Sequence, residues 1–108
     1  MSFRVVDAAE FDGRRKPIRR ALESTAFALN QFDAEAEQAG FEHDERESGQ
    51  EEVYVALRGG GLLRVGDEEI VLEPGRYVLV TPEARRQVVA GPEGLSYLVV
   101  AGVRGTFA

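Results

Sequence analysis

The stretch of sequence that decides the fold is residues 41–61, which read FEHDERESGQEEVYVALRGGG. Within it, residues 52–57 alternate between two kinds of side chain, as expected for a β-strand with one covered face. One face carries Val53, Val55 and Leu57, and the other carries Glu52, Tyr54 and Ala56. The three glycines at 59–61 predict a hairpin turn between two strands, because the lysine and the following helix of a phosphate-binding loop are both missing.

The rest of the chain continues this pattern of short apolar runs divided by turns. Gly66-Asp67 predicts a tight hairpin, and Pro74-Gly75 and Gly91-Pro92 separate further runs. The predicted strands are residues 41–47, 52–57, 62–65, 69–72, 76–81, 87–90 and 95–101. By composition alone, residues 21–33 suit a helix and a strand equally well. Short strands at this spacing predict an all-β antiparallel sandwich or barrel.

Residues 1–20 show no sustained period, so we expect an N-terminal arm or a short edge strand, followed by a folded domain over 21–108. Five cations surround Pro17 in this arm, namely Arg14, Arg15, Lys16, Arg19 and Arg20. The remainder of the chain is strongly acidic. The simplest interpretation is a solvated arm whose charges pair with the acidic body.

Composition excludes several classes of function. With 108 residues the chain forms one domain, and the lack of cysteine excludes disulfides, thiolate metal sites and a cysteine nucleophile. A formal charge of −6 argues against general binding to nucleic acids or anionic membranes, which requires positive charge. No apolar run is as long as a membrane span, and the N-terminus lacks the apolar core of a signal peptide. We therefore expect a cytoplasmic protein.

Two motifs give the chain a family resemblance. Glu52 and Gly59 fit the end of a first motif, G-x5-H-x-H-x(3,4)-E-x6-G, and Gly75 begins a second, G-x5-P-x-G-x2-H-x3-N, whose strand is residues 77–80. Over residues 27–102 the chain resembles a small single-domain cupin. The resemblance implies a double-stranded β-helix, or jelly-roll barrel, and favours a strand over a helix at 21–33. In the family, three histidines and the glutamate bind one divalent metal inside the barrel.

The histidines of these motifs are replaced here. The two positions in the first motif read Glu45 and Glu47 with the longer spacer, and neither spacer gives a histidine. His43, the single histidine of the chain, reaches such a position only if the loop before Glu52 is enlarged. The histidine of the second motif corresponds to Arg86, whose guanidinium stays protonated and cannot ligate a metal. The resemblance therefore implies a degenerate metal site.

Three functions remain open. The first is a barrel that binds a small molecule without a cofactor, in a pocket lined by Glu52, Tyr54 and Arg86, where Arg86 pairs with a glutamate and replaces the charge of the metal. The second is a metal-dependent oxygenase or isomerase with one Mn, Fe, Zn or Ni ion on an atypical ligand set, namely His43, Glu45, Glu47 and Glu52. The third is a structural or interaction module with a filled barrel.

The resemblance also implies a partner. Small cupins commonly pair through a sheet edge, and an unprotected edge strand favours aggregation. We therefore expect a homodimer in which the N-terminal arm crosses to the second subunit. No catalytic residue is assigned by the sequence.

Overall fold

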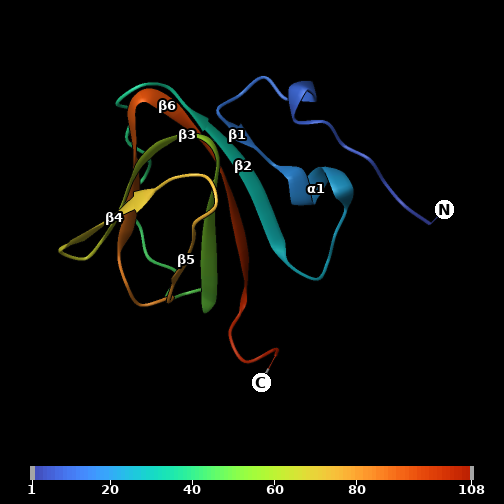
Figure 1. Ribbon diagram of the computed structural model, residues 1–108. Coiled ribbons are helices and arrows are strands. Elements are labelled where there is room, and N and C mark those ends of the chain that lie inside the picture. The colour runs from blue at the N-terminus through green and yellow to red at the C-terminus, as the bar shows by residue number, and fades with distance from the viewer. Residues whose placement is uncertain (1, 108) are drawn as a thin grey trace.

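The computed structural model describes residues 2–107 and consists mainly of antiparallel β-structure (Figure 1). Its elements are the 3-10 helix η1 (Ala8–Glu10), β1 (Arg15–Lys16), α1 (Ile18–Leu22), β2 (Ala28–Ala34), β3 (Gln50–Val65), β4 (Glu68–Leu72), β5 (Tyr77–Val80) and β6 (Arg86–Val103). The strands follow the order β1-β2-β6-β3-β4, and β5 also pairs with β3. The predicted all-β antiparallel class is confirmed. None of the helices within residues 2–107 is long and apolar enough to span a lipid bilayer.

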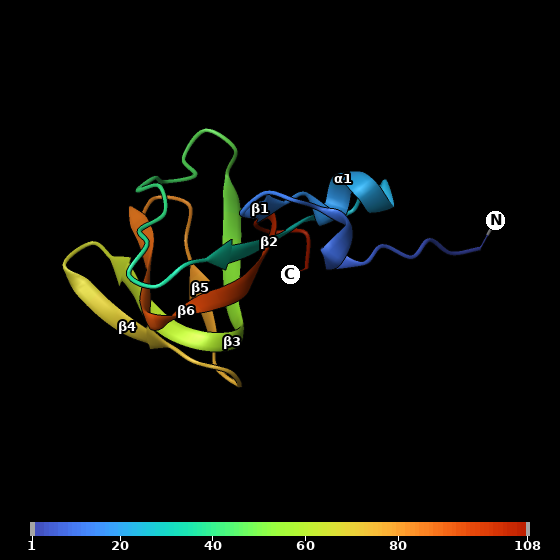
Figure 2. The same cartoon turned by 90° about the horizontal axis from the view of Figure 1, so that it is seen from above.

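The two long strands, β3 and β6, run side by side through the whole molecule. The first half of β3 pairs with the second half of β6, as in Tyr54 opposite Val99, and the second half of β3 pairs with the first half of β6, as in Leu63 opposite Val88. Shifts in register interrupt the ladder between Ala56 and Gly61. Both strands bend at this point, so the two halves of each strand face one another across the core (Figure 2).

The glycines at 59–61 lie within β3, so the predicted hairpin at that point is wrong. A Cβ atom at Gly59 would collide with the carbonyl oxygen of Gly94, and one at Gly61 would collide with the carbonyl oxygen of Val89. These glycines thus permit the close approach of two bending strands. Likewise, Gly91-Pro92 does not separate two strands, because β6 is continuous through it.

The core fills the space between the two halves. Its buried members are Tyr54, Ala56, Leu63, Leu72, Val80, Val88, Ala90, Leu95, Tyr97 and Val99. They come from β3, β4, β5 and β6, and Phe32 of β2 packs against them. The predicted alternation of residues 52–57 is confirmed, with Glu52, Tyr54 and Ala56 facing inward. Outward-facing Leu57 is 42% exposed.

The predicted strand at 41–47 is wrong. This segment is an irregular loop that touches the sheet through one isolated bridge, His43 with Arg86, and a second bridge, Ala39 with Val89, lies just before it. Phe41 is 88% exposed, and the chain turns at 46–49, where Gly49 has a φ of 69°. The segment lacks the alternating apolar residues that would hold one face of a strand against the core.

The N-terminal arm is docked on the barrel through β1, the predicted edge strand. β1 pairs with β2, placing Arg15 opposite Phe32 and Lys16 opposite Gln31. Lys16 is buried and its Nζ donates to the carbonyl oxygen of Phe11 at 2.7 Å. Within the segment 21–33, a short helix ends at Leu22 and the strand predicted by the resemblance begins only at Ala28.

Candidate functional site

The barrel contains a cavity of about 420 Å³ beside the arm. Its inner surface is apolar and aromatic, formed by Phe32, Tyr97, Val88 and Val99. Phe32 and Tyr97 stack with ring centroids 5.2 Å apart and planes inclined by 15°. Polar groups come from three places, namely β1 and β2, the loop 38–43, and the inner face of β3. An apolar cavity with a few converging polar groups is the usual form of a small-molecule site.

Glu52 and Tyr54 line the cavity and form a buried cluster with Arg86. The Tyr54 hydroxyl donates to Glu52 Oε1 at 2.7 Å, and Arg86 Nε donates to the same oxygen at 3.1 Å. Glu52 and Tyr54 occupy alternate positions of β3, so both side chains point inward from one strand. Burial and the adjacent Glu52 charge raise the pKa of the Tyr54 phenol well above its usual range, so it stays a hydrogen-bond donor.

Arg86 is the most deeply buried charged residue of this cluster, with 1% of its surface exposed. It begins β6, and its Nη1 donates to the carbonyl oxygen of Ala84. Its Nη2 has no hydrogen-bond partner among the residues that the structure describes. Glu52 and Tyr54 line the cavity, whereas Arg86 lies behind Glu52 and does not. The sequence predicts all three residues on the pocket wall. The structure brings the three together, but only Glu52 and Tyr54 lie on the wall.

The four predicted metal ligands divide into a group of three and an outlier. His43 Nε2 lies 3.5 Å from Glu45 Oε2 and 3.5 Å from Glu52 Oε1, and the ligand atoms of this trio all lie within 4.8 Å of one another. Glu47 is exposed and does not belong to this group. The sequence placed Glu47 with the others by assuming a straight strand, but the turn at 46–49 redirects it.

The trio does not fit the metal centre of the family. It offers one imidazole and two carboxylates where three imidazoles and one carboxylate would be expected. Glu52 Oε1 already accepts hydrogen bonds from Tyr54 and from the Arg86 guanidinium. That guanidinium, permanently charged and 3.1 Å from the would-be ligand oxygen, would repel a divalent cation.

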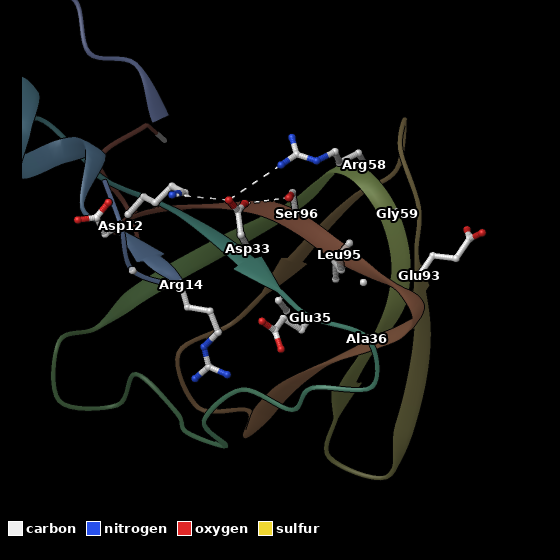
Figure 3. Close-up of a pocket in the computed structure, with 14 residues that line it drawn as sticks. Asp12, Arg14, Asp33, Glu35, Ala36, Arg58, Gly59, Glu93, Leu95 and Ser96 are labelled. Atoms are coloured by element: carbon white, nitrogen blue, oxygen red, sulfur yellow. Dashed lines mark hydrogen bonds and ion pairs between the residues drawn. The ribbon is translucent and has the colours of Figure 1, made fainter. Parts of the chain in front are cut away.

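A second, more open cavity of about 600 Å³ shares Arg14, Asp33 and Ala34 with the first (Figure 3). Asp33 Oδ1 accepts from Ser96 Oγ at 2.8 Å, and Asp33 Oδ2 lies 3.7 Å from Lys16 Nζ. Arg58 lies 4.0 Å away. Although burial acts to raise it, the hydrogen bonds from Gln31 and Ser96 and the charges of Lys16 and Arg58 hold the pKa of Asp33 below its usual range. This cluster attaches the arm to the barrel.

Sequence reasoning missed the contribution of the arm to the site. Arg14 and Arg15 line the 420 Å³ cavity, together with Asn30 and Gln38. The sequence predicts only solvated charges for these arginines, and nothing in the local sequence indicates that β1 pairs with β2. The one available signal was the clustering of five cations in a chain of net negative charge.

Comparison with solved structures identifies the fold. A cupin protein from Bacteroides fragilis superposes with a TM-score of 0.87 at 21% identity, covering 100% of this chain and 90% of that one. The TT1209 protein from Thermus thermophilus superposes with a TM-score of 0.75 at 24% identity, covering 92% and 96%. A predicted oxalate decarboxylase from Thermotoga maritima gives 0.67 at 16% identity, covering 79% and 73%.

No family model and no curated protein matches the sequence. At these identities the structural likeness establishes the architecture and leaves the chemistry to the residues themselves. The bent β3–β6 pair, the inward face of β3 and the superpositions agree with one another. The chain therefore has the double-stranded β-helix fold of the cupins, as a small single domain.

Proposed function

We propose that this protein binds a small organic molecule in the 420 Å³ barrel cavity and that the Arg86–Glu52 ion pair takes the place of the cupin metal. The observation that carries the proposal is the guanidinium of Arg86, fully buried 3.1 Å from the one glutamate that the metal motif retains. A buried cation orients Glu52 without a metal ion. The Tyr54 hydroxyl holds the same oxygen from a second direction.

The cavity wall indicates what kind of molecule fits. Phe32 and Tyr97, whose rings stack on each other, both contribute aromatic surface to the wall, and Val88 and Val99 add aliphatic contacts. Glu52 and His43 supply polar atoms at one end of this surface. A ligand with a flat apolar body and a hydrogen-bond donor directed at Glu52 would satisfy both parts of the wall. The size of the cavity favours this function over a module with a filled barrel.

A metal-dependent enzyme is the alternative, and the His43–Glu45–Glu52 trio is the observation in its favour. Elemental mass spectrometry on protein purified without chelators or a histidine tag separates the two. We expect substoichiometric metal in the wild type and a clear gain in Arg86→His, which exchanges the cation for an imidazole ligand. Near-stoichiometric metal in the wild type that disappears in His43→Ala would refute the metal-free proposal.

We also propose a homodimer formed through the outer face of the sheet. Val53 of β3 lies opposite both Leu79 of β5 and Val100 of β6, and directly opposed residues share a face. Leu79 is 55% exposed and Val103 58% exposed on this side. A groove of about 490 Å³ joins them to Phe27 of the segment before β2. A continuous apolar face of this kind is unusual on a monomer, and a second copy supplies the same apolar chemistry to cover it.

A further inference from the structure

We infer that the ligand of the barrel cavity carries a carboxylate on its flat apolar body, and that Arg14 and Arg15 of the arm bind this carboxylate. The inference rests on the proposed function and adds the chemical class of the ligand. It depends on where the two arginines lie, on what they can contact and on which charges of the cavity are already paired.

Arg15 stands at the end of a row of side chains that crosses the cavity. It lies opposite Phe32 in the β1–β2 ladder, and Phe32 lies opposite Tyr97 in the β2–β6 ladder. Directly opposed residues of antiparallel strands project to the same face. The row therefore runs from a guanidinium, across one ring, to a second ring stacked on the first at 5.2 Å. A flat molecule packed against this aromatic pair would extend one end toward the charge.

Arg14 brings a second positive charge to the same rim. Arg14 lines both this cavity and the 600 Å³ cavity, and Figure 3 shows its side chain projecting away from the Asp33 cluster. Burial raises the pKa of the Tyr97 phenol to about 12, and the charge of Arg14 opposes part of this rise. Arg14 therefore lies within electrostatic reach of Tyr97, on the aromatic surface that the ligand would cover.

The other charges of the cavity are already neutralised. Asp33 has Lys16 at 3.7 Å and a hydrogen bond from Ser96, and Glu52 has Arg86 at 3.1 Å. Arg14 and Arg15 take part in no ion pair within residues 2–107. Two unpaired cations at the rim of an apolar cavity, in a protein whose net charge is −6, are matched by an anionic group on the ligand.

Both arginines are exposed, so the expected preference is moderate. Exposed ion pairs are screened by water and salt. We expect a carboxylate to bind about fivefold to tenfold more tightly than the matching neutral amide, which corresponds to about 1 to 1.4 kcal/mol. The preference should shrink as ionic strength rises, whereas affinity for the amide should not.

The test uses 2-naphthoate and 2-naphthamide, which differ in charge but scarcely in shape. Both are titrated at neutral pH into the full chain labelled with nitrogen-15, and the amide signals of cavity residues Asn30, Tyr97 and Val99 are followed. The variant Arg14→Gln/Arg15→Gln removes the two rim charges. The control Arg19→Gln/Arg20→Gln removes equal charge from α1, whose arginines do not line the cavity. The variant Arg14→Lys/Arg15→Lys keeps the two charges. It controls for the possibility that substitution at these positions detaches the arm from the barrel.

Support for the inference is a carboxylate preference in the wild type that falls to about unity in the glutamine variant and persists in the control and lysine variants. Equal binding of the two probes to the wild type, or a preference that survives in the glutamine variant, overturns the inference and leaves the proposed function intact. If neither probe shifts the cavity amides, the proposed function fails together with the inference.

Discussion

The Arg86–Glu52 pair permits a sharp test through a double-mutant cycle of stability. Arg86→Met removes the guanidinium and keeps an apolar stem, and Glu52→Gln removes the carboxylate charge and keeps an acceptor for the Tyr54 hydroxyl. Each single change leaves one buried polar group without its partner. The double change removes both charges at once and leaves a neutral cluster of nearly the same volume.

The magnitude follows from the geometry. With Arg86 Nε 3.1 Å from Glu52 Oε1, the charge centres are about 4 Å apart, and their attraction is about 4 kcal/mol at an effective dielectric constant of about 20. Removing one partner of a buried pair typically costs about 3 to 5 kcal/mol. Losing the unsatisfied Nη2 of Arg86 offsets about 1 kcal/mol of that cost in Arg86→Met. We expect Arg86→Met to lose about 2 to 4 kcal/mol, Glu52→Gln to lose about 3 to 5 kcal/mol, and the double variant to lose about 1 kcal/mol.

Urea denaturation at neutral pH gives the four free energies of unfolding and hence the coupling energy. The neighbouring pair Arg85–Glu42 is a matched control, because its atoms are 2.9 Å apart but both side chains are more than half exposed, at 57% and 55%. We expect a coupling of at least about 4 kcal/mol for the buried pair and less than about 1 kcal/mol for the exposed pair. Additive losses in the buried cycle would show that Arg86 does not neutralise Glu52, and the reasoning about the replaced metal would be refuted.

Three further predictions concern the rest of the fold. Gly61→Ala should lower the free energy of unfolding by about 3 kcal/mol in the same urea titration, because its Cβ would meet the backbone oxygen of Val89. Gly102→Ala has open space around its Cβ and should leave that free energy nearly unchanged. Folding lowers the pKa of Asp33, so the stabilisation by its carboxylate is present above the unfolded pKa and is lost as pH falls through the folded pKa. In Asp33→Asn the free energy of unfolding should therefore fall less steeply as the pH is lowered. Leu79→Lys should convert the proposed dimer to a monomer in light scattering after size exclusion, while Arg76→Lys, on the turn before β5, should not. A wild-type chain that is monomeric at micromolar concentration would contradict the dimer.

Much of the fold could be predicted from local pattern. The alternation at 52–57 separates the two faces of β3, the motif residue Glu52 marks the inward one, and Gly66-Asp67 marks the hairpin between β3 and β4. The glycines at 59–61 and Gly91-Pro92 misled the prediction, because glycine permits both a tight turn and the close crossing of two backbones. Only the partner strand decides between these roles, and it is distant in sequence. The result was two long bent strands in place of four short ones.

The candidate site was predictable where one strand or one motif carries it. Glu52 follows from the first motif, Tyr54 follows from sharing its face of the strand, and Arg86 follows from the second motif. The conformation of the loop 41–47 was not predictable in this way, because the path of a polar segment is set by its hydrogen bonds to distant residues and leaves no hydrophobic pattern in the sequence. His43 reaches Glu52 through the bridge to Arg86, while Glu47 leaves the site at the following turn. Arg14 and Arg15 join the cavity through strand pairing over long range, which no local pattern specifies.

The proposed replacement of the metal by Arg86 changes what a cupin barrel can do with its ligand. A divalent ion offers open coordination positions and can polarise a bound oxygen, whereas a guanidinium offers only fixed N–H donors and a permanent single charge. Here the charge of Arg86 lies behind Glu52 and is neutralised by it. Arg14 and Arg15, which form no ion pair within residues 2–107, stand at the rim of the cavity. The inner end can therefore orient a ligand through hydrogen bonds to Glu52, and the rim can attract its charge. This division of roles favours selective binding over activation of the ligand.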